Sequence, residues 1–172
     1  MAPTKRDGTS WDWTANDVDA KTQSQVANAI DAALAMTSAQ AAYARLVLIL
    51  AGPFTKPLAK PDVFGWVDLS CAADCPGRAF EREFLRSQQD TFTPLFESMP
   101  AWHHVPLGPQ TRLTIRLYDE DLVYDDPIGD VVLTADDLAQ VVANGGNVPV
   151  RVSSQGAGQV LFIGISAADE GD

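Results

Sequence analysis

Five acidic residues crowd into eight positions of this 172-residue chain: Asp119, Glu120, Asp121, Asp125 and Asp126. Clustered carboxylates repel one another, so a loop of this composition is costly unless a cation neutralises it or water solvates it fully. Oxygen-only ligands suit a hard cation, and calcium above all. The segment therefore predicts a calcium-binding loop, with a solvated acidic turn as the alternative.

The acidic segment follows a stretch with a period of two. Leu113, Ile115 and Leu117 alternate with polar residues, which is typical of a half-buried strand in an antiparallel sheet. The segment ends in Asp126-Pro-Ile-Gly129. We therefore expect a strand that leads directly into the acidic loop.

The pattern Asp119-x-Asp121, followed by Asp126-Pro-Ile-Gly129, resembles the third calcium loop of C2 domains, which are β-sandwich modules that bind calcium and lipid. Further segments resemble other marks of this family and occur in the family's order: 46–52, 61–64, 91–97 and 158–163. The likeness covers about residues 43 to 167.

The resemblance implies an all-β fold, an eight-stranded antiparallel C2-like β-sandwich with an N-terminal helix. We expect strands over 44–51, 63–70, 79–87, 94–105, 112–118, 131–133, 148–152 and 158–167. No strand candidate precedes residue 44 and a strong one closes the chain, so the order resembles the permuted type II variant. The expected divisions are a disordered N-terminus (1–16), a helical extension (17–42), the sandwich (43–168) and a tail (169–172). A capping box at 134–137 predicts a helix through Val142.

If this strand order holds, the connections 52–61, 88–93 and 119–127 gather at one end of the sandwich. The resemblance then implies a calcium site of separated carboxylates, with a backbone carbonyl and water completing the shell. Its ligands would be Asp62, Asp119, Asp121, Asp126 and the carbonyl of Glu120, with Asp125 as the rival of Asp126.

Lys56 departs from the family pattern. Calcium-binding members usually carry another Asp about six residues before the one matched by Asp62, and this position is Lys56, or Pro57 if the gap falls differently. An ammonium group in that place would act as a tethered metal surrogate and would compete with calcium.

Apolar residues occupy the expected loop tips, where solvated turns are usually polar. They are Phe54 and Leu58 in one loop, and Leu122, Val123 and Tyr124 in the other. They either contact a membrane interface or fold down over the ends of the strands, and the sequence leaves both readings open.

The formal net charge of −11 argues against binding to nucleic acid. It also argues against binding to anionic lipid, unless a bound cation first reduces the negative charge. No apolar run is long enough to span a membrane, the N-terminus does not resemble a secretory signal, and the two cysteines make no disulfide framework. We therefore expect a cytoplasmic protein, peripheral to a membrane when it binds one. No catalytic motif occurs, so we expect no enzyme.

Two functions fit these observations. The first is a calcium-responsive module that binds anionic phospholipid at a membrane surface. The second is a calcium-independent C2-like scaffold that binds a protein through its sheet face or its N-terminal helix, self-association included.

Overall fold

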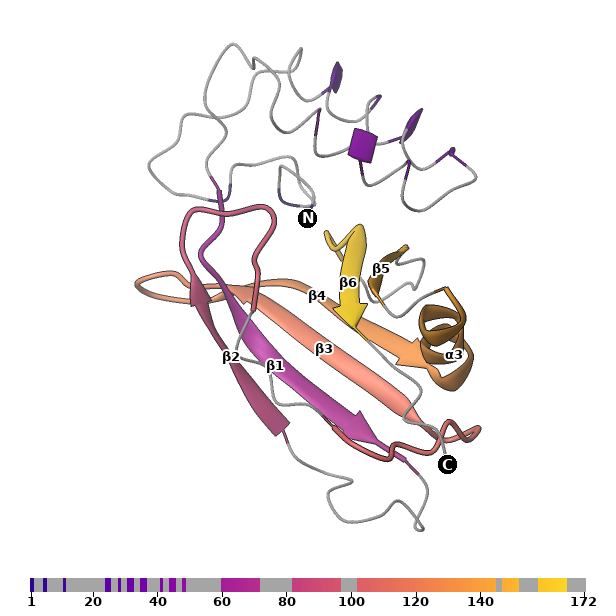
Figure 1. The fold of residues 1–172 in the computed structure, drawn as a ribbon. Helices are drawn as coiled ribbons and strands as arrows, with labels where there is room; N and C mark the ends of the chain where they lie inside the picture. Colours follow the sequence, from indigo (N-terminus) through magenta and orange to yellow (C-terminus); the bar gives the residue numbers. More distant parts are fainter. Residues whose placement is uncertain are drawn as a thin grey trace.

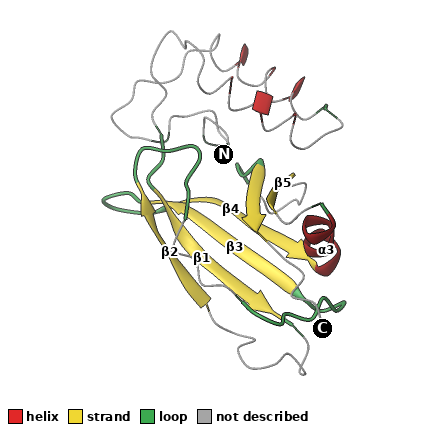
Figure 2. Cartoon of the chain, viewed as in Figure 1, coloured by secondary structure: helices red, strands yellow, loops and turns green. Residues whose placement is uncertain are grey.

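The computed structural model describes residues 60–71, 82–96, 102–144, 147–151 and 158–166, with isolated positions before residue 49. Four strands form an antiparallel sheet in the order β2-β1-β3-β4 (Figure 1). They span Val63–Ser70 (β1), Arg82–Gln88 (β2), Arg112–Asp119 (β3) and Asp126–Thr134 (β4). A helix, Ala135–Ala143 (α3), leads to an antiparallel pair made by Asn147–Arg151 (β5) and Phe162–Ser166 (β6) (Figure 2).

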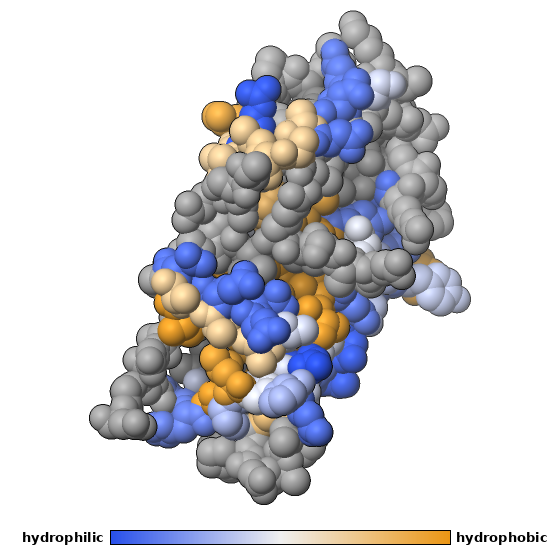
Figure 3. Space-filling view, turned by 90° about the vertical axis from the view of Figure 1, so that its right-hand side faces the viewer, coloured by the Kyte–Doolittle hydropathy of each residue, from blue (hydrophilic) through white to orange (hydrophobic). Residues whose placement is uncertain are grey.

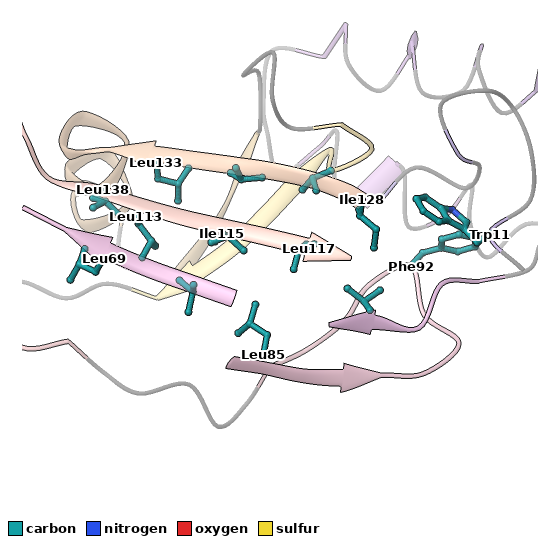
Figure 4. Packing of buried hydrophobic residues seen from close by; sticks show 14 residues of the cluster. Trp11, Leu69, Leu85, Phe92, Leu113, Ile115, Leu117, Ile128, Leu133 and Leu138 are labelled. Atoms are coloured by element: carbon teal, nitrogen blue, oxygen red, sulfur yellow. The ribbon is translucent and has the colours of Figure 1, made fainter. Parts of the chain in front are cut away.

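One face of the four-stranded sheet carries the hydrophobic core. Alternate residues of β3, Leu113, Ile115 and Leu117, are buried, as their period of two predicts. Neighbouring strands add side chains such as Val67 and Val131 in the same register. Figure 4 shows this cluster running along the sheet, with Trp11 and Phe92 at the end where Ile128 lies.

The opposite face of the sheet carries aromatic rings. Phe64 lies within 6.1 Å, between ring centroids, of the rings of Trp66, Phe84 and Tyr118. Beside them, Asp68 accepts hydrogen bonds from Arg82 at 3.0 Å and from Arg116 at 2.6 Å. This face is therefore held by contacts among its own side chains rather than by a second large sheet.

A bulge in β4 sets the geometry of the acidic end. Leu117 pairs with Gly129 and Tyr118 pairs with Pro127, so Ile128 is the extra residue between them. Its side chain is fully buried, and its carbonyl accepts a hydrogen bond of 2.9 Å from the backbone N–H of Gln159. The bulge thus connects the four-stranded sheet to the segment that leads into β6.

The capping box predicted at 134–137 is confirmed. The hydroxyl of Thr134 accepts a hydrogen bond from the backbone N–H of Asp137, and the Asp137 carboxylate accepts one from the backbone N–H of Thr134. Helix α3 extends one residue beyond the expected Val142. Leu138 and Val141 attach it to the core side of the sheet.

The prediction of an eight-stranded sandwich is wrong. In the part of the chain that the structure describes, six strands form one sheet of four and one of two. The strands expected over 63–70, 112–118 and 148–152 occur within about one residue of their expected bounds. The third expected strand begins at Arg82 among the described residues, the closing strand is shorter, and the strand expected over 131–133 extends over nine residues.

Two expected strands fail for identifiable reasons. Within 44–51, the described residues Ala44, Arg45 and Leu48 are helical, and Leu48 is 68% exposed instead of buried. A short apolar run has no periodicity that separates a buried strand from a helix. Within 94–105, residues 94–96 and 102–105 form no strand. Pro94 has no backbone N–H to donate to a sheet, and His104 has a φ of 53°, outside the strand region.

The N-terminal helical extension is represented by isolated positions. Among the described residues of 17–42, Ser24, Gln25, Asn28, Asp31, Ala32 and Ala41 are helical. The expected division into four segments stays a prediction. Cys71, directly after β1, is disulfide-bonded. In the residues that the structure describes, no helix combines the length and the apolar character that a membrane span requires.

Candidate functional site at the acidic end of the sheet

The antiparallel pairing of β1 with β3 gathers three loops at one end of the sheet. Val63, the first residue of β1, pairs with Asp119, the last residue of β3, and Asp119 also pairs with Asp126, the first residue of β4. The turn after β2 ends at Asp90, which lies next to the start of β1. The loops before β1, after β2 and between β3 and β4 therefore meet. We call this the acidic end.

Backbone N–H groups bind the carboxylates of the acidic end. The N–H of Asp62 donates to Oδ1 of Asp119 over 2.7 Å, and the N–H of Asp90 donates to Oδ1 of Asp62 over 2.8 Å. The N–H of Glu120 donates to the carbonyl of Asp62 over 2.8 Å. Asp90 has a positive φ of 52°, a conformation that Asp tolerates better than most residues. These bonds fix the three loops to one another.

Asp119 is the most unusual carboxylate of the group, because only 3% of its surface is exposed. Burial raises its pKa from the ordinary value of 3.8 to about 6, against the hydrogen bond from the Asp62 N–H, which lowers it. The negative charge of Asp121 raises the pKa further, and that of Asp62 adds to this. The ammonium of Lys5 lowers it. The structure therefore brings Asp62, Asp119 and Asp121 close enough to interact.

Lys5 neutralises the other side of the acidic end. Its ammonium forms an ion pair with Oδ2 of Asp126. The same nitrogen lies 5.9 Å from the centroid of the Trp11 ring, within the range of a cation–π contact. Asp125 lies on the exposed side, where its Oδ1 is 3.4 Å from the backbone N–H of Asp121.

The tip of the loop between β3 and β4 projects into solvent. Leu122 is fully exposed, and Val123 and Tyr124 are 74% and 82% exposed. These three side chains therefore stand away from the strands and do not fold down over their ends. We call them the apolar tip. Phe54 and Leu58, expected at the neighbouring tip, lie outside the described residues.

The donor chemistry of the acidic end suits calcium, but the arrangement does not form a cage. The described residues contain no group of three or more His, Cys, Asp or Glu side chains placed to hold a metal ion. Instead, Asp62 and Asp119 accept backbone hydrogen bonds, and Asp126 is paired with Lys5. In this arrangement the carboxylates of Asp62, Asp119 and Asp126 each have a partner within the chain.

Two residues of the acidic end were not expected from the sequence. Asp90 was not selected because it follows a strand as an ordinary turn residue. Lys5 was not selected because it lies in a polar segment far from the loops, and Lys56, chosen for the role of tethered cation, lies outside the described residues. Trp11 is buried in the core cluster and Met1 packs against it, so both described neighbours of Lys5 in this segment contact the core.

No protein-family model matches the chain, and no curated protein matches it either. The likeness to C2 domains therefore stays a resemblance carried by short segments. Function is argued below from the geometry of the acidic end and the apolar tip.

Proposed function

We propose that this chain is a binding module without catalytic activity, which recognises a partner protein through the apolar tip and does not require calcium. The exposure of Leu122, Val123 and Tyr124 carries the proposal. A single exposed apolar side chain is ordinary, whereas three in succession on a projecting loop expose apolar surface that water disfavours. Tyr124 adds a ring and a hydroxyl, a combination enriched at protein interfaces.

The charges around the tip indicate the chemistry of the partner. Glu120 and Asp125 are exposed, and Asp121 is half-buried beside them. A partner that binds the tip would therefore present an apolar pocket with Lys or Arg at its rim, so that opposite charges meet as water leaves. An anionic membrane has the wrong charge for this surface, because the whole chain carries −11.

The carboxylates of Asp62, Asp119 and Asp126 already have partners in the chain, which supports a function that does not need calcium. The hydrogen bonds to Asp62 and Asp119 and the ion pair of Asp126 compensate these three carboxylates internally. The apolar tip is thus presented by a loop that already has a defined conformation, which lowers the entropic cost of binding.

A second candidate is the calcium-responsive module that binds anionic phospholipid. The observation that favours it is the buried carboxylate of Asp119, which lies near the negative charges of Asp62 and Asp121. Such a group favours any cation that reaches it. The apolar tip would then enter the interface of the bilayer.

One set of variants separates the two candidates. Leu122→Ser with Tyr124→Ser removes the apolar tip, and Leu107→Ser is the matched control, because Leu107 is exposed in the turn before β3, at the other end of that strand. Proteins captured from an extract of the source cells are compared in calcium and in chelator. The expected partner is captured in both conditions, is lost with the double variant, is retained with Leu107→Ser, and binds again when purified.

Liposome sedimentation supplies the other arm of the test. The proposal expects no binding to vesicles of phosphatidylserine and phosphatidylcholine, with or without millimolar calcium. Sedimentation that needs calcium and disappears with the double variant would instead establish the second candidate. If a partner binds wild type and the double variant equally, the apolar tip is not the binding surface.

A further inference from the structure

Asp119 and Asp126 stand directly opposite each other on β3 and β4. Like charges in this relation destabilise a strand pair. Lys5 supplies the compensating charge, through its ion pair with Asp126 and its electrostatic effect on Asp119. The end of the β3–β4 hairpin is thus a place where a positive group is held between carboxylates contributed by two strands.

Trp11 completes the surroundings of this positive group. The Lys5 nitrogen lies 5.9 Å from the Trp11 ring centroid, and Trp11 itself is 1% exposed within the core cluster. A carboxylate beside an aromatic face is the combination that binds ammonium groups in proteins. In Figure 4, Trp11 lies beside Phe92 and close to Ile128, the bulge residue of β4. Trp11 therefore has a fixed position, which does not depend on Lys5.

We propose that the carboxylate of Asp126 and the indole of Trp11 form a binding site for an alkylammonium group, that Lys5 is its internal occupant, and that a lysine of the partner protein displaces Lys5. This inference rests on the function proposed above, and it identifies one rim residue of the partner as a lysine. The side chain of Lys5 is 17% exposed and that of Asp126 is 42% exposed, so the carboxylate is open to an incoming ammonium.

Displacement is a competition between an internal and an external ligand. A tethered group acts at an effective concentration of about millimolar order. The partner therefore binds more weakly than it would to an empty site. Its apparent affinity is reduced by the fraction of time that the site is free of Lys5. A change that removes the Lys5 ammonium should open the site, whereas a change that keeps the charge should leave it occupied.

The experiment uses the full chain and a probe without the rest of the partner, Nα-acetyl-lysine N-methylamide. Binding is followed by NMR at the indole N–H of Trp11 and the amide of Asp126, in wild type, Lys5→Gln, Lys5→Arg and Lys60→Gln. Lys60 is an exposed lysine two residues before Asp62, so Lys60→Gln makes the same change in net charge near the acidic end but outside the ion pair with Asp126. The norleucine analogue of the probe has a similar chain without the ammonium.

We expect Lys5→Gln to be half-saturated at a probe concentration at least about threefold lower than wild type, because the tethered competitor is gone. Lys60→Gln and Lys5→Arg should titrate like wild type, and the norleucine analogue should bind to none of them. Equal titration of Lys5→Gln and Lys60→Gln, or resonance shifts that avoid Trp11 and Asp126, would overturn the site.

The two experiments have separate readouts, because the probe is followed at Trp11 and Asp126, whereas partner capture is followed in the tip variants. Loss of partner capture in the Leu122 and Tyr124 double variant tests the docking surface alone. If the probe binds as expected and capture does not depend on the tip, the ammonium site stands and the docking surface is wrong. If the probe does not bind as expected but capture depends on the tip, the docking surface stands and the ammonium site is wrong.

Discussion

The backbone N–H of Asp62 donates a hydrogen bond of 2.7 Å to the carboxylate of Asp119, joining the start of β1 to the end of β3. This bond explains how a carboxylate with only 3% of its surface exposed is tolerated at the end of a strand. A buried polar group is costly unless it has a partner. The bond also explains why Asp119 is bound within the sheet while Asp125 stays at the surface.

The stability of the protein should depend on pH through Asp119. Its pKa is about 6 in the folded chain and 3.8 ordinarily, so the folded state holds the proton more tightly. This favourable contribution is complete below pH 4 and is lost as the pH rises through 6. Asp119→Asn keeps an oxygen acceptor for the Asp62 N–H but carries no charge. We expect the variant to be more stable than wild type at pH 7.5 by about 1 to 3 kcal/mol, with the difference vanishing near pH 4.

Urea unfolding between pH 4 and 8 measures this difference. Glu120→Gln, at an exposed neighbouring position, controls for the removal of one negative charge from the loop. Curves for wild type and Asp119→Asn that run parallel over this pH range would show that Asp119 titrates normally.

Trp11 should contribute to stability as a core residue although it lies far from the sheet in sequence. It is 1% exposed within the core cluster. Trp11→Ala should lower the free energy of unfolding by about 3 to 5 kcal/mol, because it removes buried apolar surface and leaves a cavity. Met36→Ala, at an exposed apolar position, should change it little. Thermal and urea unfolding of both variants check this, and equal stabilities would place Trp11 outside the folded unit.

Gly65 should be required at its position in β1, where β1 pairs with β3. A Cβ atom at this position would lie 1.9 Å from the carbonyl oxygen of Arg116, so the strands would have to shift. Gly65→Ala should destabilise the protein by about 1 to 3 kcal/mol. Gly164→Ala is the matched control, because a Cβ atom there meets nothing within 4 Å. If the two variants melt at the same temperature, the close approach at Gly65 is not a constraint.

The capping box of α3 should act as one unit. Thr134→Ala should cost about 1 kcal/mol, because the Asp137 N–H loses its acceptor at the helix N-terminus. Asp137→Asn should weaken the reciprocal bond, which the Asp137 carboxylate accepts from the Thr134 N–H. Because the two side chains share these bonds, the double variant should lose less than the sum of the single losses. Strict additivity in urea unfolding would show that the two bonds act independently.

The surface seen in Figure 3 mixes hydrophobic and hydrophilic patches over the described residues rather than showing one continuous apolar face. The apolar tip and the ammonium site are each formed by few residues, and each has a matched control variant.

Local patterns in the sequence were enough to predict several elements. The period of two in β3 and the box at Thr134–Asp137 involve neighbours in the chain, so their physical causes are visible without any tertiary contact. The convergence of Asp62 and Asp119 was also predictable, because it needs only that β1 and β3 pair in antiparallel register. The exposure of Leu122 was left open, since a tip can equally stand out or fold back.

Contacts between distant segments decided the rest. The apolar run at 44–51 had no period to indicate a helix. Among the described residues, the core of the four-stranded sheet is completed by α3, β6 and Trp11. Lys5 pairs with Asp126 in a segment whose neighbours Trp11 and Met1 both pack against the core. Such a pairing depends on how the chain closes over long distances, and no local preference of Lys5 or Asp126 encodes it. Local patterns were thus enough for β1, β3, α3 and the charge of the acidic end, whereas long-range closure of the chain makes Lys5 the cation that pairs with Asp126.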